Sequence, residues 1–118
     1  MLWFSLAFAT DIVVPDDYTD LDEALDHAGD GDRVLLRPGT YGLHGYELTH
    51  DVVIEALGTG VFIEGTSSGS SPVLDIRAEV EIHNIDGVCL TDHRFFRVQG
   101  GNDTLLLTGS TIHDCQAG

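Results

Sequence analysis

One eleven-residue segment, GDRVLLRPGTY (residues 31–41), constrains the fold of this chain more than any other. Its apolar run, Val34 to Leu36, has the length of a short buried strand. Pro38-Gly39 then ends that strand, because proline cannot extend a hydrogen-bond ladder. At the other side we expect Gly31 to form a turn that is too tight for a Cβ atom. The segment therefore predicts a strand held between two sharp turns.

The residues just before this segment predict an amphipathic helix, LDEALDHA (residues 21–28). Thr19 or Asp20 is the expected N-cap, and Glu23 stands three residues after Asp20, as in a capping box. Gly29 is the expected C′ residue that ends the helix. The apolar side chains recur at i, i+3, i+4 and i+7: Leu21, Ala24, Leu25 and Ala28.

Apart from this helix, the pattern predicts short strands separated by Gly, Asp, Asn, Ser and Thr turns. We expect strands at residues 11–15, 34–36, 51–57, 61–64, 72–76, 79–85, 95–98 and 104–107. The run GTSSGSSP (residues 65–72) predicts a loop that protrudes between two of them. Three strands align as a repeat in which Ile54, Ile82 and Leu107 are equivalent. Coils of about 20–28 residues would give about four turns of a solenoid.

Residues 14–41 resemble the N-terminal signature of the pectin-lyase-like superfamily of right-handed parallel β-helices. The signature consists of a strand, an amphipathic capping helix, a Gly-Asp step, an apolar strand and Pro-Gly-Thr-Tyr, which here is Pro38 to Tyr41. The resemblance implies an all-β fold, a right-handed parallel β-helix (solenoid) whose helix covers the open end of the first coil, where uncovered strands would recruit other chains. Residues 99–118 resemble coils of bacterial surface and autotransporter-type passengers.

We expect residues 10–118 to be the N-terminal part of this β-helix domain. A solenoid needs a polar cap at each end, and no capping element follows the last predicted strand before Gly118. The sequence therefore predicts either a domain truncated at its C-terminal side or a coil edge that is covered by another chain.

The chain carries 20 acidic residues against 5 Lys+Arg, a formal charge of −15. Without a basic cluster it does not suit nucleic acid or an anionic membrane surface. Solubility in an extracellular or salty setting explains the acidity, and binding of divalent cations is the alternative.

The first nine residues, MLWFSLAFA, end in an A-x-A arrangement at Ala7 and Ala9. This predicts the remnant of a secretory signal peptide that is cut before Thr10. The segment lacks a positively charged start and is short, so a misplaced start or an internal hydrophobic strand is the alternative. No other apolar run approaches the roughly 20 residues of a transmembrane helix.

The two cysteines, Cys89 and Cys115, are separated by about the length of one coil and lack zinc-ligand spacing. In a secreted chain they could pair as a disulfide. In a solenoid they could equally stack as buried thiols in adjacent coils. The sequence leaves both interpretations open.

The resemblance to the superfamily implies two possible catalytic patterns, because its enzymes use two different sets of residues. Members that cleave uronates use a basic residue near calcium-binding carboxylates, for which Arg94 and Arg97 with Asp75 and Asp92 are the candidates here. Alternation along the strand predicts that Arg97 points outward as a salt-bridge partner. No family motif surrounds these residues, so we assign none of them a catalytic role.

Hydrolytic members of the superfamily use two or three aspartates on adjacent coils, because one donates a proton while another activates water. Asp75, Asp86 and Asp114 are the candidates, but no spacing identifies a pair, and alternation predicts a solvent-facing Asp75. The sequence assigns no catalytic residue.

Histidine and aspartate side chains are the possible metal ligands in this sequence. The six histidines form no HxH or HExxH motif and are predicted to be solvated or to cap turns: His27, His44, His50, His83, His93 and His113. Asp30 and Asp32 are the calcium candidates, because this ion prefers several hard oxygen ligands. The spacing of an EF-hand is missing, and the alternative role of these two acids is to set the turn. No other cofactor is indicated.

Two functions follow from these patterns. The first is a secreted or cell-surface β-helix module, non-catalytic, which is structural, adhesive or in contact with carbohydrate. Its partner would be a polysaccharide or a cell-surface component, and its C-terminal coil edge would pair with further coils or another chain. The alternative is the N-terminal fragment of a polysaccharide lyase or glycoside hydrolase that acts on acidic polysaccharide.

Overall fold

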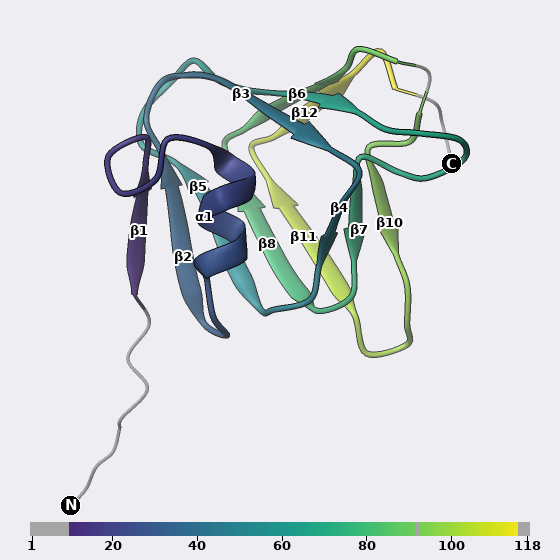
Figure 1. The fold of residues 1–118 in the computed structure, drawn as a ribbon, viewed down its shortest axis with the longest axis horizontal. Coiled ribbons are helices and arrows are strands. Elements are labelled where there is room, and N and C mark those ends of the chain that lie inside the picture. Colours follow the sequence, from purple (N-terminus) through teal and green to yellow (C-terminus); the bar gives the residue numbers. More distant parts are fainter. Residues whose placement is uncertain (1–9, 92, 116–118) are drawn as a thin grey trace, which may run out of the picture.

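The protein is a mostly β parallel solenoid of about four turns with one short helix near the N-terminus (Figure 1). The computed structural model describes residues 10–91 and 93–115, so the predicted signal remnant and Asp92 lie outside the described residues. The expected all-β solenoid is thereby confirmed, and its right-handed sense stays a prediction.

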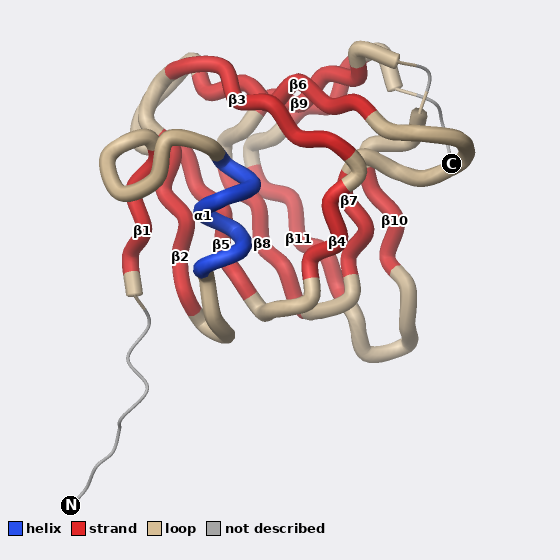
Figure 2. The backbone as a smooth tube through the Cα atoms, viewed as in Figure 1, coloured by secondary structure: helices blue, strands red, loops and turns tan. Residues whose placement is uncertain are grey.

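Three parallel sheets form the faces of the solenoid, seen in red in Figure 2. Sheet A consists of β1 (Asp11–Val14), β2 (Asp32–Leu36), β5 (Val52–Ala56), β8 (Glu79–His83) and β11 (Thr104–Thr108). Sheet B consists of β3 (Gly39–His44), β6 (Val61–Thr66), β9 (Asp86–Cys89) and β12 (Thr111–His113). Sheet C consists of β4 (Tyr46–Leu48), β7 (Leu74–Ile76) and β10 (Phe96–Val98).

The register of sheet A confirms the predicted repeat. Ile54 pairs with Ile82, and Ile82 pairs with Leu107. Val34, one coil earlier, pairs with Ile54. The side chains of Val34, Ile54 and Ile82 are at most 3% exposed, so this column of aliphatic residues runs through the core. Since a strand alternates its faces, the intervening residues form the outer surface.

Four strands were not predicted from the sequence: β3, β4, β9 and β12. Their sequences, GTYGLH, YEL, DGVC and TIH, are short or contain glycine and aspartate, which are depleted in strands. Pairing with neighbouring coils makes them strands. The predicted loop over residues 65–72 was also too long, because Gly65 and Thr66 belong to β6. Ser67 is buried, and its hydroxyl donates a hydrogen bond to the carbonyl of Pro72.

The helix α1 (Leu21–His27) covers the N-terminal end of the solenoid, as expected. Its residues Leu21, Ala24 and Leu25 are at most 1% exposed. The helix packs against β1 and β3. Its Asp26 also accepts a 2.6 Å hydrogen bond from the hydroxyl of Tyr46 in β4. The helix therefore contacts the first strand of every sheet, which closes this end of the core.

Both predicted ends of this helix are confirmed in position, with Asp20 at the N-cap and Gly29 at C′ after the C-cap Ala28, but the expected capping bond is absent. Asp20 stands at the N-cap, but its side chain makes no capping hydrogen bond. At the other end Ala28 adopts extended backbone. Gly29 stands at C′ outside the left-handed region, and its N–H donates a 2.7 Å hydrogen bond to the carboxylate of Asp32.

Gly31 is required in its turn for a different reason from the one expected. A Cβ atom at this position would meet nothing within 4 Å, so the space is not restricted. Its φ of +87°, however, lies in the region that only glycine adopts without strain. In this conformation its N–H bonds to the carbonyl of Asp51 in the next coil.

Candidate functional site

The outer face of sheet C brings together two of the sequence candidates, Asp75 and Arg97. In β4, β7 and β10 the residues Glu47, Asp75 and Arg97 pair in register, so their side chains form one row across the sheet. Arg97 Nη2 lies 3.1 Å from Asp75 Oδ2, which confirms the predicted salt-bridge role of Arg97. Arg77, which no pattern in the sequence singled out, bridges Glu47 at 3.1 Å and Asp75 at 3.6 Å.

Asp75 itself is not solvent-facing, which corrects the prediction from strand alternation. The residue is only 8% exposed although it points to the outer face. The reason is that neighbouring long side chains cover it. Arg97 lies over its carboxylate, and Gln99 Nε2 donates a 2.8 Å hydrogen bond to Oδ1. We call this group, Glu47, Asp75, Arg77, Arg97 and Gln99, the sheet C cluster.

The charge state of the sheet C cluster follows from its contacts. Burial raises the pKa of Asp75, but hydrogen bonds from Arg97 and Gln99 and the charges of Arg97 and Arg77 outweigh it, so the pKa lies below its ordinary 3.8. Asp75 is therefore held as a carboxylate that is already bonded on both oxygens. Such a group is poorly suited to transfer a proton at neutral pH.

Asp75 should make the stability of the protein depend on pH. Because its pKa is lower in the folded than in the unfolded chain, the stabilisation is present above the unfolded value and is lost as pH falls through the folded value. Unfolding monitored by circular dichroism between about pH 5 and pH 1 should therefore show a steeper loss of stability for the wild type than for Asp75→Asn.

Arg97→Gln serves as the matched second variant, because it removes the main partner and keeps the carboxyl group. It should flatten the same pH profile in part, since Arg77 and Gln99 remain. At pH 7, Asp75→Asn should cost about 1–3 kcal/mol through poorly paired buried hydrogen bonds. Parallel profiles for the wild type and Asp75→Asn would show that this carboxylate does not contribute as described.

The other catalytic candidates are not brought together. Asp86 lies on the outer face of sheet B, where the hydroxyl of Thr111 donates a 2.5 Å hydrogen bond to it. Asp114 lies in the turn after β12, with a φ of +57°. Arg94 precedes β10, and its backbone carbonyl accepts a hydrogen bond from Val73. Since Asp75 belongs to sheet C, Asp75 and Asp86 stand on different faces.

The calcium candidates hold the backbone of the first turn. Asp32 accepts hydrogen bonds from the N–H groups of Thr10 and Gly29 at 3.0 and 2.7 Å. Asp30 accepts one from the N–H of Asp51 at 3.0 Å and lies 3.5 Å from His50 Nδ1. This supports the alternative role of the two acids in setting the turn, and a calcium role for them stays a prediction.

The contacts of the histidines are with residues of other types, some close by in the sequence and some in a neighbouring coil. His27 stacks on Tyr18, and His83 lies 3.0 Å from Glu81. Within residues 10–91 and 93–115, no three His, Cys, Asp or Glu side chains gather in a way that could hold a metal ion.

Sequence reasoning missed the ion pairs between coils. Arg33 binds Asp11 through two hydrogen bonds of 2.9 Å, and Arg37 binds Asp16 at 2.7 Å. Each pair lowers the pKa of its aspartate, first through the hydrogen bond from arginine. In the sequence, each aspartate precedes its arginine by about the length of one coil, and this spacing could have indicated the two ion pairs. These side chains are about half exposed, so each pair contributes little to stability.

A groove of about 360 Å³ lies between α1 and the outer face of sheet B. We call it the α1 groove. Its lining residues carry two carboxylates, an imidazole and two hydroxyls, and no pattern in the sequence indicated this groove. His44 Nδ1 lies 2.7 Å from Thr66 Oγ1, which orients the imidazole ring. The lining residues are Asp22, Gly42, Leu43, His44, Tyr46, Glu64, Thr66 and Leu90.

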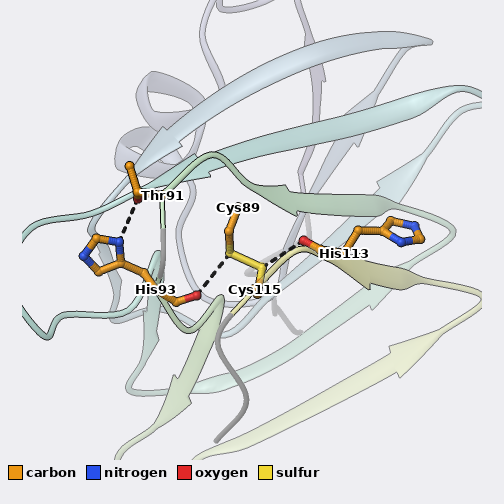
Figure 3. The surroundings of a disulfide bond; sticks show 5 residues. All are labelled: Cys89, Thr91, His93, His113 and Cys115. Carbon is orange, nitrogen blue, oxygen red and sulfur yellow. Dashed lines mark hydrogen bonds between the residues drawn. A yellow bond between two sulfur atoms is a disulfide. The ribbon is translucent and has the colours of Figure 1, made fainter.

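The structure decides the state of the two cysteines. Cys89 and Cys115 form a disulfide, with Cα atoms 5.0 Å apart (Figure 3). Cys89 is the last residue of β9, and Cys115 follows β12, which pairs with β9. The bond therefore joins adjacent coils at one corner of sheet B. Of the two interpretations that the sequence left open, the disulfide is the one that the fold adopts.

Together, the fold and these contacts define a disulfide-linked parallel β-solenoid. No family model matches the chain, and neither a curated protein nor a solved structure is significantly similar to it. Among the described residues, no helix is long and apolar enough to cross a membrane.

Proposed function

We propose that the chain is a non-catalytic β-solenoid module of a secreted or cell-surface protein, and that it contacts carbohydrate through the α1 groove. The groove carries this proposal, because hydroxyl-rich ligands need several polar groups in a concave site. The carboxylates of Asp22 and Glu64 can accept hydrogen bonds from sugar hydroxyls, and Leu90 offers an apolar contact.

The contacts of the acidic candidates support a non-catalytic role. A hydrolase needs one carboxyl group that donates a proton and another that activates water or attacks the sugar. Asp75 is bonded to Arg97 and Gln99, while Asp86 is bonded to Thr111 on another face. Both carboxylates support the coil stack in this arrangement.

Two features support a location outside the cell. Disulfides persist in oxidising compartments and are rare in the cytosol, and Cys89 and Cys115 form one here. The formal charge of −15 suits solubility in such a setting.

The charge of the α1 groove indicates the class of sugar. Asp22 and Glu64 would repel the carboxylates of a polyuronate, so the groove favours neutral or amino sugars. Isothermal titration of the full chain against neutral, amino and uronate oligosaccharides tests this. Binding to the first two classes is expected. Glu64→Gln should weaken it at least about tenfold, since a hydrogen bond to a charged group contributes about 1.5–3 kcal/mol, and His44→Ala should weaken it by up to about tenfold, since an ordinary hydrogen bond contributes about 0.5–1.5 kcal/mol.

Glu55→Gln is the matched control, because Glu55 lies on the outer face of sheet A and does not line the groove. It should leave sugar affinity unchanged. If no class of sugar binds, or if Glu64→Gln and Glu55→Gln have the same effect, the groove is not a sugar site.

The alternative, a lyase or hydrolase fragment acting on acidic polysaccharide, has one observation in its favour. The sheet C cluster places two arginines beside two carboxylates on an outer face. Incubation with polygalacturonate, with and without Ca²⁺, distinguishes the two functions by absorbance of unsaturated product and by reducing ends. Product formation that Arg97→Gln abolishes would overturn the non-catalytic proposal.

A further inference from the structure

The outer face of sheet B carries two hollows, one at each end of β6. The α1 groove lies at the carboxyl end of this strand, where Glu64 and Thr66 line it. A second hollow of about 450 Å³ lies beside Gly60, just before β6 begins, and we call it the turn hollow. Three glycines line part of it, and its polar lining residues are Thr59, Asn84 and Asp86.

Phe62 lies between the two hollows. It is an outward residue of β6, pairs with Asp86 of the turn hollow, and precedes Glu64 of the α1 groove by two positions. Its side chain is 43% exposed, and no other phenylalanine, tyrosine or tryptophan among the described residues is as exposed. A strand rises about 3.3 Å per residue, so the face from Gly60 to Thr66 is about 20 Å long. This length exceeds one sugar ring and suits a chain of sugars.

This face is a side of the solenoid and not one of its ends. Sheet B forms the upper side of the molecule in Figure 1. The coils of a solenoid stack along its axis, and each coil contacts only its neighbours. Outward side chains such as Phe62 point away from that stack. A further coil would therefore stack beside the last one and would not cover this face.

The outer face of sheet B is acidic. Asp22 and Glu64 line the α1 groove, and Asp86 lines the turn hollow. Within the part of the chain that the structure describes, none of these three carboxylates takes part in an ion pair. The strands β3, β6, β9 and β12 contain no lysine or arginine. A ligand with positive charges at both ends of β6 would therefore complement this face.

We propose that the outer face of sheet B binds a chain of amino sugars with free, protonated amines, laid along β6 from the α1 groove to the turn hollow. This inference rests on the proposed sugar contact in the α1 groove, and it adds the kind of sugar, the length of the chain and a second subsite. The amines bind Glu64 at one end and Asp86 at the other through charge-assisted hydrogen bonds.

The ring of Phe62 holds the middle of the sugar chain. The face of an aromatic ring carries partial negative charge, so it attracts the C–H groups on the apolar face of a sugar and a nearby ammonium group. Asp86 keeps its place in the sheet while it binds the ligand, because the hydroxyl of Thr111 bonds to its Oδ1 atom and Oδ2 can accept from an amine.

Isothermal titration of the full chain with glucosamine oligomers tests the length of the site. The hexasaccharide should bind at least about tenfold more tightly than the disaccharide, since linked contacts at the two hollows reinforce each other. Phe62→Ala should weaken binding of the hexasaccharide about tenfold. Leu106→Ala is the matched control, because Leu106 is an exposed outward residue of sheet A, and it should leave the affinity unchanged.

A hexasaccharide of N-acetylglucosamine tests the need for positive charge. It should bind at least about tenfold more weakly than the free-amine chain, and this difference should shrink as salt rises, because salt screens exposed charges. Asp86→Asn keeps an acceptor for Thr111 and should weaken binding of the free-amine chain about tenfold. Glu55→Gln, on the outer face of sheet A, should have no effect. Oligolysine of equal charge should bind more weakly than the free-amine chain, because it offers no sugar face to Phe62.

The outcomes separate this inference from the proposed function. Disaccharide binding without a gain for the hexasaccharide would overturn the inference and leave the sugar contact of the α1 groove in place. The same holds for equal effects of Phe62→Ala and Leu106→Ala, or for equal affinity of the free-amine chain, the N-acetylated chain and oligolysine. Absence of binding by every oligosaccharide would reject both proposals.

Discussion

Replacing Phe95 by alanine is expected to lower the free energy of unfolding by about 3–5 kcal/mol, the cost of removing a fully packed aromatic ring. Phe95 is 4% exposed and contacts the ring of Phe96 edge-on, with centroids 4.7 Å apart. Two glycines of sheet B, Gly65 and Gly87, make room for its ring. A Cβ atom on them would approach the ring to 3.2 and 2.9 Å. Urea denaturation followed by circular dichroism measures the loss.

Gly87→Ala and Phe62→Ala test the cause of this effect. The added methyl group would lie 2.9 Å from both Phe95 and Ile112, so Gly87→Ala should cost about 1–3 kcal/mol through overpacking. In Phe95→Ala/Gly87→Ala part of that cost should disappear, because the ring is gone. Phe62→Ala, on the outer face, should change stability by less than about 0.5 kcal/mol. Strict additivity of the two core changes would contradict the packing described.

Loss of the disulfide should have an effect of similar size. Cys89 and Cys115 are separated by 26 positions in the sequence, and the loop-entropy relation gives about 3.5 kcal/mol for a loop of that length. Chemical denaturation of Cys89→Ala/Cys115→Ala, compared with the oxidised wild type, measures this quantity. Because the bond joins β9 to the segment after β12, hydrogen exchange should increase most in β12.

A thiol reductant provides the control for this prediction. It should lower the stability of the wild type and leave Cys89→Ala/Cys115→Ala unchanged. Equal stability of oxidised and reduced wild type would mean that the β9–β12 pairing alone holds the last coil. That outcome would reject the disulfide as a stabilising link.

Part of the fold could be predicted from the spacing of apolar residues along the chain. The stripe of Leu21, Ala24 and Leu25 specified a helix with one buried face, and these residues are the ones that α1 buries. Apolar residues at alternate positions placed Ile54 and Ile82 in one column of the core, and the structure pairs them. Such patterns suffice because periodicity alone decides which face of an element is apolar.

Contacts between coils were harder to predict from the sequence, because the number of residues in a coil varies. Asp32 pairs with Val52 in the next coil, and Val52 pairs with Val80 in the coil after that, but the second of these steps spans a longer stretch of chain. The length of each loop sets the number of residues between positions that pair in successive coils. The spacing of residues in the sequence therefore did not reveal that Arg97 would cover Asp75. Strand alternation correctly placed Asp75 on the outer face, but its burial depends on side chains from a neighbouring strand.

The amino-acid sequence by itself determined the class of fold, the helix near the N-terminus and the repeat of sheet A, because these depend on apolar periodicity and on turn residues. Only the tertiary structure decided the disulfide between Cys89 and Cys115, the burial of Asp75 and the α1 groove. Each of these depends on which residues of successive coils become neighbours. That outcome is set by the length and conformation of every turn between them.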